Sequence, residues 1–112
     1  MIYKIKSRIW IEHNNQVLIG EGRFQLLKAI EQTGSLTKAA KELGLSYKKA
    51  WHLIDSVNKA SKEPITINTI GGKGGGGVQL TNYGKTLVVA FEEINQNCWI
   101  FLENELEKIK NL

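Results

Sequence analysis

The sequence predicts an α+β, mainly helical fold in a single domain that spans residues 1–112. Three observations support this prediction: apolar and polar residues alternate near the N-terminus, later segments place apolar residues at helical spacing, and a glycine-rich tract separates two strand-like segments. Hydrophobic residues make up 42% of the chain, which is enough for one compact core.

The first predicted elements are a β-hairpin and a helix. The alternation over residues 3–12 is typical of a half-buried strand. The two asparagines at 14–15 tolerate the positive φ angles of a tight turn, so residues 16–19 are expected to pair back as the second strand. A helix is then expected over residues 22–33, with Gly34 as its C-terminal stop.

Two short amphipathic helices follow. Ser35 is a good N-cap, and residues 36–43 place apolar side chains at i, i+3, i+4 and i+7 before Gly44. The same spacing resumes from Ser46 and continues until Pro64 closes the region. Two short helices joined by a tight turn that contains glycine indicate a helix-turn-helix.

A second hairpin and a long helix complete the prediction. Residues 65–70 and 78–80 are expected to form antiparallel strands, and Thr81 is expected to cap a helix that continues without proline to Leu112. This order of elements is that of a winged helix-turn-helix. It has an N-terminal β-hairpin, a glycine-rich wing hairpin and a long C-terminal dimerisation helix.

The glycine tract at residues 71–77 has three interpretations. A phosphate-binding P-loop requires Gly-Lys followed by Ser or Thr, but Lys73 is followed by glycine. A flexible linker fits the glycine content but not the strand-like flanks. A wing tip fits both, and its backbone N–H groups can approach phosphates or a minor groove. The DNA contacts predicted in the wing are Gly72, Lys73, Gly74 and Gly75.

The charge of the chain is unevenly distributed. Residues 1–80 hold 12 Lys/Arg against 6 Asp/Glu, whereas residues 81–112 hold 3 against 5. A basic surface attracts polyanions, of which nucleic acid is the commonest in a cell. The lysines of the second short helix are either a solvated face or DNA ligands, and their place at its N-terminus favours DNA. The DNA contacts predicted in the two short helices are Ser35, Thr37, Lys38, Ser46, Tyr47, Lys48, Lys49 and His52.

The long C-terminal helix has more apolar residues than one small domain can cover. We therefore predict that it packs against its own copy across a two-fold axis. The residues predicted at this interface are Leu87, Phe91, Ile94, Cys98, Phe101 and Leu102.

Other classes of function have little support in the sequence. The single cysteine and two histidines do not suggest a catalytic set, so we expect no enzyme activity, no cofactor and no structural metal site. No signal peptide and no membrane-spanning stretch is evident, so a protein of the cytoplasm without membrane attachment is expected, in a prokaryote-like cell.

Two segments resemble a known family. Residues 34–58, GSLTKAAKELGLSYKKAWHLIDSVN, and residues 71–84, GGKGGGGVQLTNYG, are similar to the N-terminal domain of ModE-type molybdenum-dependent regulators, which is itself similar to the LysR winged-helix domain. The resemblance implies a dimeric transcription factor whose recognition helix starts at Ser46. Full-length regulators of this type continue into molybdate-binding domains, whereas this chain ends at Leu112. We therefore expect a stand-alone DNA-binding version that does not bind molybdate.

The predicted function is that of a homodimeric regulator that binds duplex DNA sequence-specifically and controls molybdenum- or oxyanion-related genes. The alternative is a protein-interaction module, in which the apolar C-terminal helix docks a partner protein and the lysines remain solvated. A steep dependence of affinity on salt distinguishes DNA binding from apolar docking.

Overall fold

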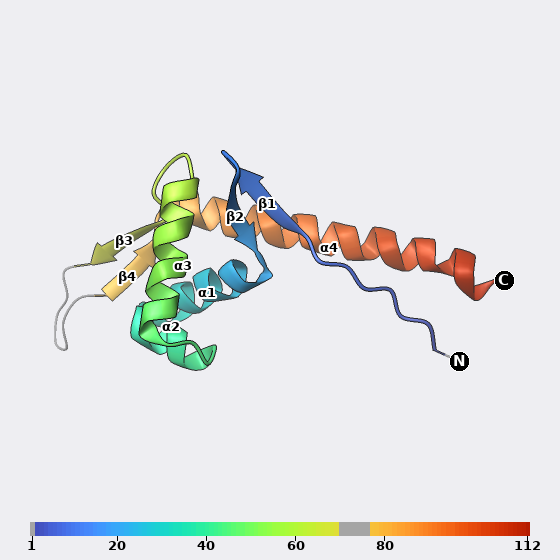
Figure 1. Ribbon diagram of the computed structural model, residues 1–112, viewed down its shortest axis with the longest axis horizontal. Helices are drawn as coiled ribbons and strands as arrows, with labels where there is room; N and C mark the ends of the chain where they lie inside the picture. The colour runs from blue at the N-terminus through green and yellow to red at the C-terminus, as the bar shows by residue number, and fades with distance from the viewer. Residues whose placement is uncertain (1, 70–76) are drawn as a thin grey trace.

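Four helices and two antiparallel hairpins make up the part of the chain that the computed structural model describes, residues 2–69 and 77–112 (Figure 1). This confirms the predicted α+β, mainly helical architecture. In chain order the elements are β1 (Trp10–His13), β2 (Gln16–Gly20), α1 (Glu21–Thr33), α2 (Leu36–Glu42), α3 (Tyr47–Ala60), β3 (Thr66–Thr69), β4 (Gly77–Leu80) and α4 (Asn82–Lys110).

The N-terminal hairpin has the predicted turn but a shorter first strand. Asn14 and Asn15 have φ angles of 54° and 62°, as a tight hairpin turn requires. Strand β1 begins only at Trp10, which pairs with Gly20, so the predicted strand over residues 3–12 was wrong in its N-terminal part. The reason is the partner strand: β2 ends at Gly20, where α1 begins, and earlier residues have nothing to pair with in this hairpin.

The helix-turn-helix forms where the sequence predicts it. Helix α1 packs against both α2 and α3. The Ser35 hydroxyl accepts a hydrogen bond from Lys38 N at 3.1 Å, and the Ser46 hydroxyl accepts one from Lys49 N at 3.0 Å, so both predicted N-caps are confirmed. Gly44, in the turn between α2 and α3, has φ of 67°, a conformation that favours glycine.

The second hairpin is held against the end of α1. Strands β3 and β4 pair antiparallel from Thr66 with Leu80 to Thr69 with Gly77. Val78 N donates to the carbonyl oxygen of Gly34 at 3.1 Å, which fixes the hairpin beside the C-terminus of α1. The residues between the two strands, 70–76, lie outside the described part of the chain, and so do the predicted wing contacts.

The core is formed mainly by α1 and the elements around it. Ile19, Leu26, Leu27 and Ile30 are fully buried there. Phe91 of α4 joins this core, with 1% of its surface exposed and its ring centroid 5.6 Å from that of Phe24. The structure thus differs from the prediction for Phe91, because its own chain covers the side chain that was assigned to a dimer interface.

Helix α4 begins against Pro64 and Ile65, just before β3, and then extends well beyond the body. The Thr81 hydroxyl accepts from Gly84 N at 2.9 Å and donates to the carbonyl oxygen of Pro64 at 2.7 Å. A Cβ at Gly84 would overlap the carbonyl oxygen of Ile65, so glycine is what allows this close approach. The 29 residues of α4 span about 44 Å, and the molecule is 61 Å long.

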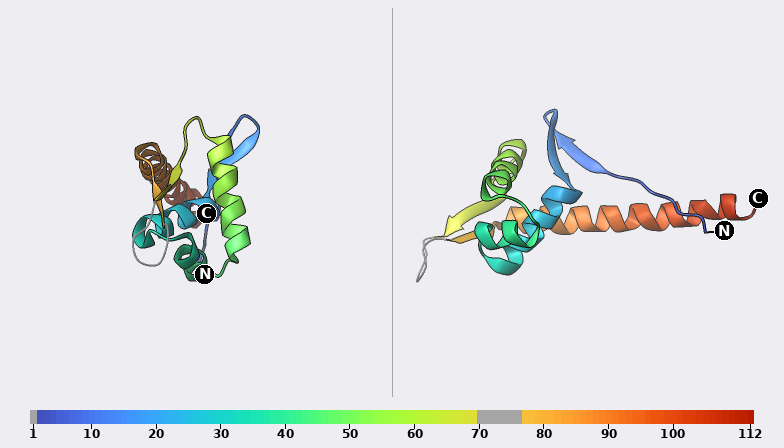
Figure 2. Two further views of the ribbon diagram at one scale, coloured as in Figure 1. Left: turned by 90° about the vertical axis from the view of Figure 1, so that its left-hand side faces the viewer. Right: turned by 60° about the horizontal axis from the view of Figure 1, so that its bottom comes forward.

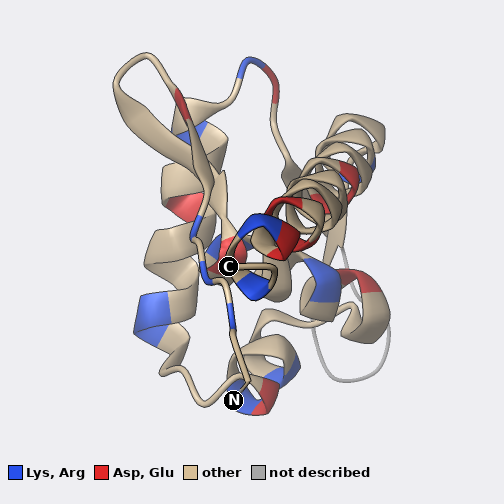
Figure 3. Ribbon diagram, turned by 90° about the vertical axis from the view of Figure 1, so that its right-hand side faces the viewer, with Lys and Arg blue, Asp and Glu red and all other residues tan. Residues whose placement is uncertain are grey.

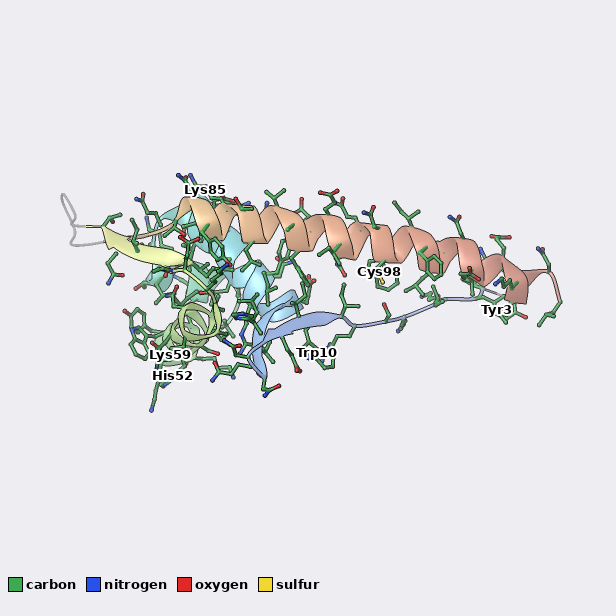
Figure 4. The ribbon with its side chains drawn as sticks, turned by 90° about the horizontal axis from the view of Figure 1, so that it is seen from above. Tyr3, Trp10, His52, Lys59, Lys85 and Cys98 are labelled. Atoms are coloured by element: carbon green, nitrogen blue, oxygen red, sulfur yellow. The ribbon has the colours of Figure 1, made fainter. Side chains whose placement is uncertain are left out.

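The segment before β1 runs along the projecting half of α4. Figures 2 and 4 show this extended segment beside the helix, with Tyr3 near the far end. On α4, Cys98 and Leu102 are partly buried and Leu106 is buried, whereas Phe101 is exposed. None of the described helices is long and apolar enough to cross a membrane.

Candidate nucleic-acid interface

Helix α3 presents a continuous outer stripe of side chains to solvent. At about 100° per residue, the stripe occupies a sector of about 140° around the helix. Ala50, Ile54 and Val57 lie in the adjoining sector, at about 280° to 340° from Tyr47, and are buried in the core. Over the first nine residues of α3, the outer stripe consists of Tyr47, Lys48, Trp51, His52 and Asp55. Further along the helix, Asn58 and Lys59 fall in the same sector.

Lysines gather around the N-terminal end of α3. Lys48 lies in the outer stripe, and Lys49 lies about 100° further around the helix. Lys38 is exposed at the start of the neighbouring helix α2. Among the described residues, none of these three lysines has an acidic partner within 4.0 Å. Figure 3 shows basic positions at these neighbouring ends, whereas α4 has both signs of charge.

A hollow of about 520 Å³ separates α3 from the second hairpin. Trp51 and Asp55 line it from α3, and Asn68 and Thr69 line it from β3. Thr37 and Ser35 close it at the start of α2. Of the described residues that line this hollow, Asp55 is the only Asp, Glu, Lys or Arg.

The C-terminal half of α3 is fixed by polar contacts. Asn58 Oδ1 accepts hydrogen bonds from Ile65 N at 2.7 Å and from Thr66 N at 3.2 Å, and Asn58 Nδ2 donates to Thr66 Oγ1 at 3.0 Å. His13 of the first hairpin lies with Nδ1 2.6 Å from the carbonyl oxygen of Ala60. These bonds fix the direction in which α3 projects its free N-terminal half.

The structure brings together most of the residues predicted to contact DNA. Tyr47, Lys48 and His52 are exposed in the outer stripe, and Thr37 and Lys38 are exposed at the start of α2. The hydroxyl groups of the two predicted serine contacts already cap their helices, so capping is their first role. Gly72, Lys73, Gly74 and Gly75 lie outside the described residues.

Two residues of the outer stripe were not predicted as contacts. The first is Trp51, which has 48% of its surface exposed and its ring edge-on to that of His52, with the ring centroids 5.3 Å apart. Asp55 was not considered as a contact. Extending the helical spacing from Tyr47 by four and eight residues gives Trp51 and Asp55, so the helical period contained the signal that identifies them.

The residues predicted at a dimer interface share one face of α4 but differ in how far the rest of the chain covers them. Ile94 and Phe101 are 47% and 60% exposed, and they share a row with Leu87 because the three are seven residues apart. Leu87 is partly buried against the core, and Cys98 and Leu102 are also partly buried. The free apolar surface of this row therefore comes from Ile94 and Phe101.

The titratable side chains of the described residues do not form a metal-binding cluster. No group of three His, Cys, Asp or Glu side chains among them is close enough to hold a metal ion. Burial lowers the pKa of the Arg23 guanidinium, whose Nη2 lies 3.3 Å from Ser56 Oγ on the side of α3 away from the hollow.

Comparison with known families identifies this arrangement. A family model described as "Bacterial regulatory helix-turn-helix protein, lysR family" matches residues 22–85, more than half of the chain. The chain belongs to this family. The match begins in α1 and ends in the first turn of α4, so it includes the helix-turn-helix and the second hairpin.

Several curated proteins named ModE are similar to this chain, which confirms the predicted resemblance. "Molybdenum transport protein ModE" of Azotobacter vinelandii is 39% identical over 88 residues, covering 79% of this chain and 33% of that protein. "DNA-binding transcriptional dual regulator ModE" of Escherichia coli (strain K12) is 42% identical over 74 residues, covering 66% and 28%. "Transcriptional regulator ModE" of Haemophilus influenzae is 34% identical over 105 residues, covering 91% and 41%.

The chain thus spans about a third of the length of the curated relatives it matches. Among solved structures, "Crystal structure of S. aureus MepR-DNA complex" matches with a TM-score of 0.56 and 21% identity. The match covers 84% of this chain and 65% of MepR. At this identity the likeness concerns the fold, and it confirms the predicted winged-helix class.

Proposed function

We propose that this LysR-family protein is a homodimeric transcriptional regulator that binds duplex DNA sequence-specifically. The observation that supports the proposal best is the outer stripe of α3, which presents polar and cationic side chains beside a hairpin placed as a wing. In a helix-turn-helix protein this helix enters the major groove, and its N-terminal residues contact base edges and phosphates.

The charge distribution around α3 supports the same proposal. Lys38, Lys48 and Lys49 have no acidic partner among the described residues, so no ion pair has to break before they contact phosphates. Lysines that neutralise phosphates release condensed counterions, which supplies most of the non-specific affinity of a DNA-binding protein. Tyr47, Trp51 and His52 add hydrogen-bonding and apolar groups suited to base edges.

The proposed homodimer rests on α4. Ile94 and Phe101 leave apolar surface exposed on one row of a helix that projects from the body, and a second copy of the same helix would cover it. A two-fold dimer presents two copies of α3, so the proposed DNA site consists of two half-sites related by approximate symmetry.

The biological setting is also a proposal. The relatives are named as ModE regulators and as a molybdenum transport protein, so we propose control of molybdenum- or oxyanion-related genes. A regulator of bacterial genes acts on the chromosome, so we place the protein in the cytoplasm. We assign it no enzyme activity. We propose that the 112-residue chain binds DNA without binding molybdate.

A salt titration tests the proposed DNA binding. Binding of the protein to labelled duplex DNA selected from random sequences is measured by fluorescence anisotropy between about 50 and 200 mM salt. The logarithm of the binding constant is expected to fall linearly with that of the salt concentration, with a slope of about −0.9 per phosphate contact. Failure to enrich any duplex, together with capture of a partner protein that is insensitive to salt, would favour the alternative of a protein-interaction module.

A further inference from the structure

Asp55 has a position and a charge that the proposed DNA binding does not yet explain. It is the only acidic residue of α3, a helix whose residues are all described. It lies at about 80° in a sector that runs from Tyr47 at 0° to His52 at about 140°, so it is near the centre of the outer stripe. The other four members of the stripe all have hydrogen-bond donors.

The ion pair with Lys59 does not account for this position. Asp55 Oδ2 lies 2.9 Å from Lys59 Nζ, one helical turn later. Pairs of this kind on an exposed helix add little stability, and they work equally well on any exposed face. The lysine side chain is 72% exposed and the aspartate side chain 34%, so the lysine is free to swing towards a phosphate while the carboxylate stays at the hollow.

The chemistry of a carboxylate limits what it is able to meet on DNA. An ionised carboxylate only accepts hydrogen bonds, so a phosphate repels it. In the major groove, donors are found on the N4 amino group of cytosine and the N6 amino group of adenine, and aspartate pairs with the cytosine group. Adenine N6 lies beside the acceptor N7, which suits the amide of asparagine or glutamine better.

We infer that Asp55 is a specificity-determining residue that accepts a hydrogen bond from the N4 amino group of a cytosine in each half-site. This inference rests on the proposed binding of duplex DNA by α3. The hollow of about 520 Å³ beside Asp55 leaves the carboxylate accessible, and the lysines at the start of α3 lie two turns away, where they contact the phosphates. At a DNA site that lacks this cytosine amino group, the carboxylate has no hydrogen-bond donor to pair with. It therefore also disfavours non-specific binding.

The test compares the wild-type protein with Asp55→Asn, which keeps the shape of the side chain and removes its charge. A duplex selected by the wild-type protein is changed one base pair at a time, and each Kd is measured by fluorescence anisotropy. The wild-type protein is expected to prefer a C·G pair by about 5- to 150-fold at one position of each half-site. Asp55→Asn is expected to lose this preference, to accept adenine there, and to bind unrelated duplex DNA more tightly.

Two control variants separate specificity from charge and from helix stability. Glu63→Gln makes the same charge change in the exposed loop after α3, and Lys59→Met removes the ion pair but keeps the carboxylate. Both are expected to keep the cytosine preference. If Lys59→Met loses it as Asp55→Asn does, Asp55 acts through its ion pair and the inference is overturned.

The outcomes also distinguish the inference from the function on which it rests. If the wild-type protein selects no duplex, the proposed function fails and the inference fails with it. If the wild-type protein selects a site and Asp55→Asn has the same preference at every position, the inference alone is overturned. Thermal unfolding of each variant confirms that binding is compared between folded proteins. Asp55→Ser also removes the carboxylate and is expected to lose the same preference for cytosine.

Discussion

Helices α3 and α4 both expose side chains to solvent, but these side chains differ in chemistry. On α3 the outer stripe is largely polar and partly cationic, and the aliphatic side chains Ala50, Ile54 and Val57 face the core. On α4 the buried contacts with the body are concentrated near its start, and Ile94 and Phe101 remain exposed further along. A polar stripe is stable in water and attracts a charged ligand, whereas an apolar row gains free energy when a partner covers it. The two helices therefore suit different partners, DNA for α3 and a second copy of the chain for α4.

The largest expected effect is on the free energy of unfolding, and it distinguishes the buried phenylalanine of α4 from the exposed one. Phe91 packs on Phe24 in the core, so Phe91→Ala is expected to lower the free energy of unfolding by about 3–5 kcal/mol. Phe101→Ala removes a side chain that is mostly in water and is expected to change the stability of the monomer far less. Urea unfolding at low protein concentration measures both. Equal losses of stability would mean that the core covers Phe101 as well as Phe91.

The next effect concerns the proposed dimer. Joint substitution of Ile94→Asp and Phe101→Asp puts two charges into the exposed row and is expected to weaken dimerisation by roughly 100-fold or more. Sedimentation equilibrium measures the change. The matched control is Val89→Asp with Ile100→Asp, since these two exposed residues lie on another side of α4. Loss of the dimer in the control variant alone would assign the interface to that other side.

A smaller effect, on DNA affinity, tests which side of α3 meets the DNA. Lys48 lies within the outer stripe, whereas Lys49 lies about 100° further around the helix. Lys48→Ala is therefore expected to weaken DNA binding roughly 5- to 10-fold and to reduce the salt slope by about one unit, with a smaller loss for Lys49→Ala. Anisotropy titrations at several salt concentrations measure both, with Lys62→Ala in the loop after α3 as control. A larger loss for Lys49→Ala would mean that α3 meets DNA with a different side.

The smallest effect is expected for molybdate. The N-termini of α2, α3 and α4 each have a backbone N–H that is already bonded to the capping hydroxyl of Ser35, Ser46 or Thr81. Fewer donors are then free to converge on an anion at these termini. Calorimetric titration of the 112-residue chain is expected to give similarly weak heats with molybdate and with sulfate. A strong signal selective for molybdate would contradict the proposal that this chain does not bind it.

The sequence by itself determined the elements whose signals are local. Ser35 and Ser46 begin helices because their hydroxyls satisfy backbone N–H groups within three residues, and such caps depend on nothing distant. The asparagines of the first turn act in the same way, since residues that tolerate positive φ are enough to place the turn. The helix-turn-helix, the long last helix and the basic start of α3 all follow from patterns of this short range.

Only the tertiary structure decided which residues the rest of the molecule covers. The sequence pattern put Phe91 and Phe101 on one broad apolar stripe, but Phe24 buries the first while the second lies where α4 has left the body. The length of β1 was likewise decided by where its partner strand ends, at Gly20. Burial and pairing depend on residues distant in the chain, and helical or strand periodicity does not show which distant residues cover a given side chain.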